Sequence, residues 1–199
     1  MGWFSRFNRH LVLGLIVLLA TAVSSFAAPK RGGDFIIPVG QFPPHFNCGI
    51  KSGSTMATPC TQIFVGLIQV GENWELMPYL AKSWKISSDK LTYTFKLHAG
   101  TEFHDGKPVT SKDVAFSLNM SKKNHPFGPY MFGAVDRVET PDKYTAVIKL
   151  KQPHPALMVA LTLPLMPIVP EHVYGDHAGP IRKNPANIQA VGSGPFKVK

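Results

Sequence analysis

Two segments with alternating apolar and polar residues constrain the fold more than any other feature. Residues 91–97 read LTYTFKL and residues 144–150 read YTAVIKL, so every second side chain is apolar. A polar turn and a further short strand-like segment precede each of them. Alternation with a period of two is typical of a strand that buries one face. The sequence therefore predicts two β-hairpins, over residues 84–97 and 134–150.

Two segments carry the features of helices. Thr110 and Asp113 match a capping box with apolar residues after it, which predicts a helix of about 12 residues beginning just after Thr110. Residues 56–68 also have apolar side chains near helical spacing, with Pro59 in the first turn. The small polar loop at residues 52–55 precedes this segment. Its backbone N–H groups are placed to hold a carboxylate, although Ser and Thr more often cap their own helix.

The remaining segments are shorter and alternate with turns. We expect a buried strand at residues 34–39, a short helix at 156–163, an extended linker at 163–170, one helical turn from Pro170 and a last strand at 196–199. The chain has 18 prolines and 17 glycines, which favours many short elements over a helical bundle. With 44% hydrophobic residues it is able to bury a core. Together these features predict a mixed α/β fold.

The first 27 residues differ from the rest of the chain. Two arginines precede an apolar run at residues 11–20, and residues 25–27 (SFA) have the small side chains of a cleavage site. We therefore predict a cleaved secretory signal peptide at residues 1–27. The alternative, a membrane-spanning anchor, needs about 20 apolar residues, more than this run provides. The first cysteine is Cys48, so no lipid-anchor cysteine adjoins the cleavage point, and we expect a soluble mature chain in the periplasm without a lipid anchor.

The charge pattern argues against nucleic acid as a partner. The chain has 21 Lys and Arg against 12 Asp and Glu, a net charge of +9. A nucleic-acid binder gathers such charge into a stripe with interleaved aromatic residues. Here the basic residues are scattered and mostly single, as expected for solvated surface lysines.

The only two cysteines, Cys48 and Cys60, lie in the part predicted to be exported. An even pair in a secreted chain usually forms a disulfide, so we predict a Cys48–Cys60 bond. A metal pair or a reactive thiol is the alternative, but neither a second CxxC nor a histidine at zinc spacing accompanies the cysteines. We therefore predict no metal site and no cofactor.

His104 and Asp105 are the residues that most suggest catalysis. Neighbours on an extended segment point to opposite faces, and a catalytic dyad also needs a nucleophile and an orienting group. The motifs HExxH, GxSxG, the P-loop and GxGxxG do not occur in the sequence. We interpret His104 and Asp105 as structural residues, assign no catalytic residue and expect no enzyme.

Three longer stretches, in this order, resemble landmarks of one protein family. They are LAKSWKISSDKLTYTFKLHAGTEFHDGKPVTSKDVAFSL from Leu80, ETPDKYTAVIKLKQPHPAL from Glu139, and NPANIQAVGSGPFKVK from Asn184. The chain resembles the family-5 extracytoplasmic solute-binding proteins, which are the peptide, dipeptide and nickel receptors of ABC importers. The resemblance covers essentially the whole chain after residue 27. One departure is His98, where the family usually has a basic residue in its scaffold.

The resemblance implies the fold of the type II periplasmic binding proteins, in which two α/β lobes close over a ligand. Family members are much longer, so residues 28–199 correspond to the N-terminal part of the family domain, the first lobe only, with the second lobe absent from this chain. The implied function is peptide binding for import, with the membrane permease subunits of an ABC importer as partners and a monomeric state. A truncated remnant or fragment that keeps only the scaffold is the alternative.

For the ligand site the resemblance implies Gly53, Ser54 and Thr55, before the helix expected at 56–68, and Tyr130 in an aromatic segment. A helix-start loop and a packing aromatic explain these residues equally well. A receptor for nickel or another small solute is a further alternative. Nickel-type members resemble the chain less, because no Arg or Lys occurs between residues 152 and 181, where that branch places a ligand-clamping arginine. Peptide is therefore the leading substrate class.

Overall fold

The computed structural model describes residues 32–34, 36–38 and 40–199, and the chain divides into two units, residues 1–38 and 39–199. The signal peptide predicted at residues 1–27 lies outside the described residues. The described part of the first unit has neither helix nor strand, so the strand predicted at 34–39 is wrong for residues 34 and 36–38. All the helices and strands given below belong to the second unit.

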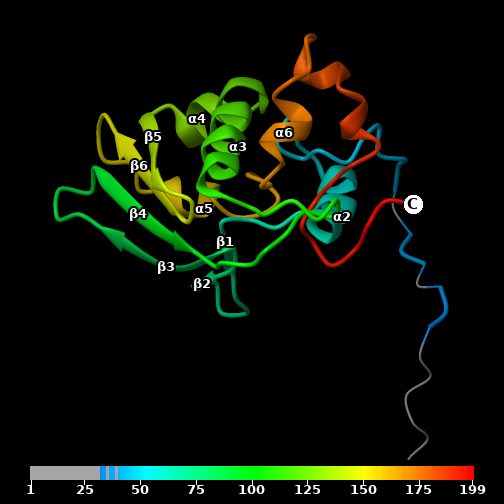
Figure 1. Ribbon diagram of the computed structural model, residues 1–199, viewed down its shortest axis with the longest axis horizontal. Helices are drawn as coiled ribbons and strands as arrows, with labels where there is room; N and C mark the ends of the chain where they lie inside the picture. Colours follow the sequence, from blue (N-terminus) through cyan, green and yellow to red (C-terminus); the bar gives the residue numbers. More distant parts are fainter. Residues whose placement is uncertain (1–31, 35, 39) are drawn as a thin grey trace, which may run out of the picture. The chain divides into compact units, whose positions relative to one another are not determined.

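A four-stranded antiparallel sheet forms one layer of the second unit (Figure 1). Its strands are β3 (Ala81–Ile86), β4 (Thr92–Leu97), β5 (Val135–Asp142) and β6 (Thr145–Leu150), in the spatial order β3, β4, β6, β5. Strands β3 and β4 form one hairpin and β5 and β6 the other, so both predicted hairpins are confirmed. The two hairpins join through β4 and β6, where Phe95 pairs with Ala146.

The inner face of this sheet carries the main hydrophobic core. Tyr93, Phe95 and Leu97 are buried along β4 and alternate with more exposed residues, as the period-two pattern predicts. Ile148 of β6 and Leu118 of a helix that covers the sheet are completely buried in the same cluster. Burying a large apolar side chain contributes about 1.5 to 3 kcal/mol, so this face stabilises the sheet strongly.

The covering helix is α3 (Ser111–Asn124), which begins where the capping box predicts. The Asp113 carboxylate accepts a hydrogen bond from the backbone N–H of Thr110 at 2.8 Å and, through its other oxygen, from the N–H of Glu171 at 3.0 Å. Glu171 begins the single turn α6 (Glu171–Tyr174), which confirms the turn predicted after Pro170. One buried carboxylate therefore joins the starts of two helices that lie far apart in the sequence.

Helix α2 (Ser54–Ile63) starts two residues earlier than predicted and ends five residues earlier. Phe64 leaves the helix in an extended conformation, because the residues that follow pair with other segments. The carbonyl of Val65 accepts from the N–H of Ile168, and the carbonyl of Leu67 accepts from the N–H of Ala81. Strands β1 (Ile68–Val70) and β2 (Leu76–Pro78) then form a small hairpin that was not predicted from the sequence.

Most of the remaining elements are short. They are α4 (Gly128–Phe132), α5 (Leu157–Ala160) and two 3-10 turns, η2 (Ile181–Lys183) and η3 (Pro185–Asn187). Helix α5 covers only half of the span predicted at 156–163, and residues 163–170 form a turn followed by an extended segment rather than a linker extended throughout. The strand predicted at 196–199 is wrong, since these residues pair with no strand.

A second hydrophobic cluster surrounds α2. Cys48 and Cys60 are buried there and form the predicted disulfide. Phe64, at the end of α2, and Tyr174 of α6 belong to the same cluster, so segments from both ends of the second unit share this core. None of the helices in the described part of the chain is long and apolar enough to cross a membrane.

Candidate functional site

The start of α2 is the first candidate site. Gly53 is the N-cap residue and has φ 129, a backbone conformation that only glycine adopts without strain. Its carbonyl accepts the first two hydrogen bonds of the helix, from the N–H groups of Met56 and Ala57. The first N–H groups of an α-helix have no partner inside the helix. Gly53 and Ser54 are exposed, so these N–H groups face solvent and can bind a carboxylate or a carbonyl.

Capping of α2 differs from the expectation that Ser and Thr would cap it. Ser54 and Thr55 lie in the first turn itself, after the Gly53 N-cap, and the helix has no side-chain cap hydrogen bond. Pro59 consequently lies in the second turn instead of the first. Because neither hydroxyl is used as a cap, the small polar side chains add to the exposed hydrogen-bonding surface at this helix start.

The segment before α2 is fixed by buried polar contacts. The side chain of Asn47 is completely buried, and its amide donates to Oδ1 of Asn187 at 3.0 Å. Its own Oδ1 accepts from the N–H of Gly49 at 3.0 Å. The Cys48–Cys60 bond ties the same segment to the middle of α2. Asn47 and Asn187 were not predicted from the sequence, because no local pattern links two asparagines 140 positions apart.

Tyr130 lies on α4 and not beside the start of α2. Its side chain is 81% exposed, so the interpretation as a packing aromatic is wrong. Helix α4 contacts α3 and α5, and Figure 1 shows α3 between α4 and α2. The structure thus brings Gly53, Ser54 and Thr55 together and leaves Tyr130 apart from them.

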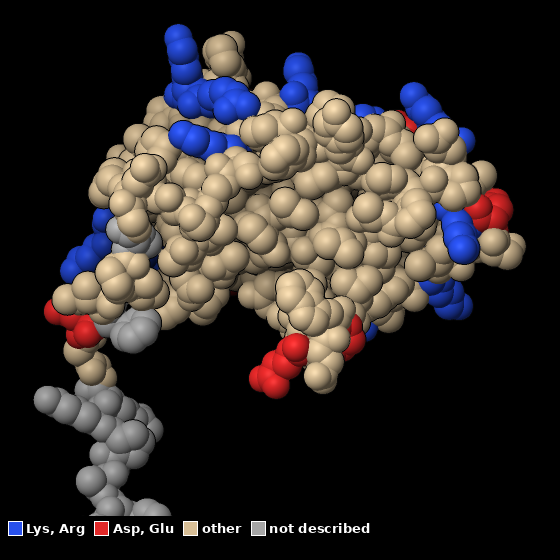
Figure 2. All heavy atoms as spheres, turned by 180° about the vertical axis from the view of Figure 1, so that it is seen from behind, with Lys and Arg blue, Asp and Glu red and all other residues tan. Residues whose placement is uncertain are grey.

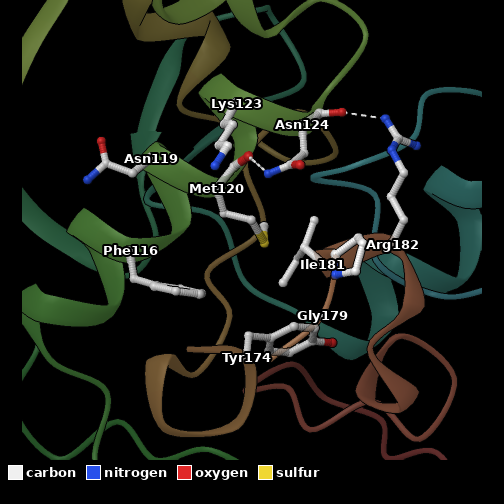
Figure 3. A pocket seen from close by; sticks show the side chains of 10 residues that line it. Phe116, Asn119, Met120, Lys123, Asn124, Tyr174, Gly179, Ile181 and Arg182 are labelled. Carbon is white, nitrogen blue, oxygen red and sulfur yellow. Dashed lines mark hydrogen bonds between the residues drawn. The ribbon is translucent and has the colours of Figure 1, made fainter. Parts of the chain in front are cut away.

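A cavity of about 510 Å³ lies between α3 and residues 174–182. In Figure 3 the side chains of Phe116, Met120, Tyr174 and Ile181 surround it. Lys123 and Arg182 also line the cavity, together with two asparagines. No sequence pattern predicted this cavity, because its two walls, residues 116–124 and 174–182, are far apart in the sequence and neither carries a motif.

Arg182 carries a positive charge beside this cavity and affects the groups around it. Its guanidinium donates to the backbone carbonyl of Asn124 at 2.6 Å, at the end of α3 (Figure 3). Burial lowers the pKa of His125, and the positive charge of Arg182 lowers it further. The pKa of His45 is lowered by burial, then by the charges of Lys51 and Arg182. Burial and the nearby positive charges therefore both favour the neutral form of the two imidazoles.

His104 holds the end of the chain in place. Its Nδ1 accepts from the N–H of Gly192 at 3.2 Å, and its Nε2 lies 2.9 Å from the carbonyl oxygen of Gly194, to which it donates in this tautomer. The backbone N–H of His104 donates to the Gly192 carbonyl at 2.7 Å. Both ring nitrogens are engaged in structural hydrogen bonds, which supports the interpretation that His104 is structural.

Asp105 makes a separate contact with α6. Its carboxylate lies 2.7 Å from Nε2 of His172 and also accepts from the N–H of Lys107. Burial acts to raise the pKa of Asp105, but the hydrogen bonds from His172 and Lys107 outweigh it, and the net pKa is lowered. Within the described residues, no three His, Cys, Asp or Glu side chains lie close enough to hold a metal ion.

Comparison with known proteins identifies relatives that align with most of the chain. The family model described as bacterial extracellular solute-binding proteins, family 5 Middle, matches residues 75–199. A Brucella ovis protein with the provisional name ABC transporter peptide-binding protein is 35% identical over 184 residues, 90% of this chain and 34% of that protein. The glutathione-binding protein GsiB of Pectobacterium atrosepticum is 29% identical over 194 residues, 96% of this chain and 36% of its own. The chain spans about a third of the length of these curated relatives.

Two solved structures show the same fold. The oligopeptide-binding protein AppA of Bacillus subtilis, in complex with a nonapeptide, has a TM-score of 0.72 and 28% identity, covering 79% of this chain and 32% of AppA. NikZ of Campylobacter jejuni, in complex with Ni(L-His), has a TM-score of 0.71 and 30% identity, covering 80% of this chain and 31% of NikZ. The chain has the mixed α/β fold of part of the first lobe of a type II periplasmic binding protein. The match over residues 75–199, joined to this fold, shows that the chain belongs to the bacterial extracellular solute-binding proteins of family 5.

Proposed function

We propose that this chain is part of the substrate-binding component of an ABC importer and that its ligand is a peptide. The observation that carries the proposal is the start of α2, where Gly53 and Ser54 are exposed, Thr55 is half-buried, and the first backbone N–H groups of the helix have no partner within it. A peptide offers carbonyl groups and a terminal carboxylate, which are the partners that such N–H groups bind. Tyr130 supplies an exposed aromatic surface for a second part of the ligand.

The names of relatives favour peptide over other solutes. The Brucella ovis protein and AppA are named for peptide binding, and GsiB is named for glutathione, which is itself a small peptide. NikZ has a similar TM-score and binds Ni(L-His), so a nickel complex is the second candidate ligand. The absence of Arg and Lys between residues 152 and 181 favours the peptide.

The proposal includes a location and partners. We expect export by the signal peptide at residues 1–27, a monomer outside the cytoplasmic membrane, and delivery of the ligand to membrane permease subunits. Binding by closure of two lobes requires a second lobe in the functional receptor. No step of bond chemistry is proposed, since His104 and Asp105 serve the scaffold.

Peptide titration of the receptor tests the proposal, with thermal stability as the readout. A bound ligand raises the melting temperature, and a peptide pool identifies the sequences that do so. Ser54→Pro removes one N–H at the first helical position, where proline is tolerated. One hydrogen bond to a charged group contributes about 1.5 to 3 kcal/mol, so we expect affinity to fall by about 10-fold or more. Ser54→Ala keeps the N–H and is expected to have a smaller effect.

A control substitution separates binding from folding in this experiment. Glu72→Gln lies on the β1–β2 hairpin, away from the proposed site, and is expected to bind as the unmodified protein does. A receptor that melts cooperatively and responds to no peptide, while Ni(L-His) stabilises it, would replace the peptide by the nickel complex. A cooperative melt with no response to either ligand would refute the proposed function.

A further inference from the structure

We propose that the cavity between α3 and residues 174–182 is a separate binding site for a small molecule with an apolar body and one carboxylate. The cavity lies in a different place from the exposed start of α2, and the inference does not rest on peptide binding there. Its volume of about 510 Å³ lies within the range of about 300 to 1,000 Å³ that is usual for small-molecule sites.

The apolar body of the ligand is specified by four side chains. Phe116 and Met120 come from α3, and Tyr174 and Ile181 come from the opposite wall (Figure 3). The hydroxyl of Tyr174 donates to the carbonyl of Ala186 at 2.7 Å, and burial raises its pKa far above the ordinary value. Tyr174 is therefore a neutral residue whose hydroxyl is already bonded. This arrangement suits an aromatic or branched aliphatic group.

The charge of the ligand is specified by Lys123 and Arg182. Both line the cavity, and none of the Asp and Glu residues that the structure describes does so. In the view of Figure 2, Lys and Arg side chains gather at the upper left, and no Asp or Glu is seen among them. One N–H group of Arg182 is bonded to the Asn124 carbonyl, which leaves the other guanidinium N–H groups for a ligand.

The end of α3 works against an anion, because carbonyl groups at a helix C-terminus carry negative partial charge. Arg182 offsets this effect directly by binding the Asn124 carbonyl. Arg182 also lies close enough to His125 and His45 for its charge to lower their pKa values, after burial and, at His45, after Lys51. Two cations around a mostly apolar cavity match a monoanion with a large apolar part better than phosphate.

Calorimetric titration of the whole chain with 3-phenylpropionate tests this site. The matched uncharged probe is 3-phenylpropionamide, which has the same ring and chain. We expect the acid to bind about 5-fold more tightly than the amide, and its affinity to fall as salt is added. N-acetyl-L-phenylalanine distinguishes the source of the carboxylate. Tighter binding of this probe indicates the C-terminal residue of a peptide, and equal binding indicates a free organic acid; both results support the proposed ligand class.

Two lysine variants locate the binding. Lys123→Gln removes a cation of the cavity and is expected to weaken 3-phenylpropionate binding about 3-fold. Lys183→Gln removes a neighbouring exposed charge that does not line the cavity, and we expect no change. Equal affinities for acid and amide would overturn the proposal, as would equal losses in the two variants. Absence of saturable binding to a chain that melts cooperatively would also overturn it.

Discussion

The sheet region (β3 to β6 with α3) and the α2 region (residues 45–63 and 174–199) contrast in how they are held together. In the sheet region, large apolar side chains at alternating strand positions pack against one helix. In the α2 region, a disulfide, a buried asparagine pair and the Tyr174 hydrogen bond connect segments with little regular structure. Figure 1 shows the two regions side by side, with α3 adjoining both.

This contrast shows that strand packing is encoded locally, whereas buried polar contacts between distant segments are not. A strand pattern fixes the buried face from neighbouring residues alone, whereas a contact such as Asn47 to Asn187 depends on the whole chain having folded. Apolar packing also tolerates replacement by other apolar groups, while a buried polar pair loses its stabilisation when either partner is removed. We therefore expect the stability of the sheet region to depend on the volume of its buried side chains. The stability of the α2 region should depend on its hydrogen-bonding side chains and its disulfide.

The largest effect is expected from Phe95→Ala in the centre of the sheet. Phe95 is completely buried between β3 and β6, and removal of its ring leaves a cavity. We expect a loss of about 3 to 5 kcal/mol of unfolding free energy, measured by chemical denaturation. Lys85→Ala, on an exposed position of β3, serves as control. A loss below about 1 kcal/mol for Phe95→Ala would contradict the role given to the sheet core.

Removal of the disulfide is the next largest change. Cys48 and Cys60 are 12 positions apart, and closing such a loop contributes about 3 kcal/mol in the chain-entropy model. The double variant Cys48→Ala/Cys60→Ala is expected to unfold at lower denaturant concentration. Hydrogen exchange should increase more in α2 than in β4 if the α2 region depends on this bond. Equal increases in hydrogen exchange in α2 and β4 would contradict the claim that the disulfide stabilises the α2 region in particular.

A smaller effect is expected from Asn47→Ala. The substitution leaves Oδ1 of Asn187 and the N–H of Gly49 without their partner in a buried environment. We expect a loss of about 1 to 3 kcal/mol in unfolding free energy. Asn73→Ala, in the exposed β1–β2 turn, is the matched control and should change stability little. Similar losses for both variants would show that the buried pair contributes no more than a surface amide.

The smallest effect concerns acid sensitivity at Asp105, which joins the sheet side of the molecule to α6. Its pKa is lowered because the hydrogen bonds from His172 and Lys107 outweigh burial, which opposes them. A lowered pKa in the folded protein stabilises the fold above the unfolded-state value of about 4, and this contribution is lost as the pH falls through the folded value. For this partly exposed pair we expect less than about 1 kcal/mol.

Asp105→Asn should therefore be less stable than the unmodified protein near pH 6, and the difference should disappear in acid. Protonated aspartic acid carries no charge and resembles asparagine in shape, so the two proteins become equivalent there. Unfolding curves at a series of pH values measure the difference. A gap that persists or widens below about pH 3 would show that the Asp105 charge is not its cause.

The sheet region was predictable from the sequence because its signals are local. The alternation around Phe95 and the capping box of Thr110 and Asp113 each fall within a few residues, and the structure confirms both hairpins and the start of α3. The end of α2 was not predictable in this way. Val65 and Leu67 continue an apolar run of helical appearance, but they leave the helix to pair with Ile168 and Ala81, which are distant in sequence.

The candidate sites show the same limit. The polar loop before α2 was visible in the sequence, although the position of the N-cap at Gly53, with Ser54 and Thr55 inside the first turn, emerged only from the structure. The cavity at Phe116 and Ile181 was invisible, since neither wall is distinctive alone. The strand predicted at residues 196–199 failed because Phe196 donates its N–H to the carbonyl of Gln62 in the last turn of α2, and not to a strand.

Native mass spectrometry of the protein purified from the extracytoplasmic fraction of its own cells tests the central claim, that the protein is a peptide receptor. We predict a complex whose mass exceeds that of the unfolded polypeptide, and peptides that are released on denaturation and sequenced. Adding such a peptide back to emptied protein should raise its melting temperature. A folded protein that releases no peptide, and whose melting temperature no peptide changes, would contradict the claim.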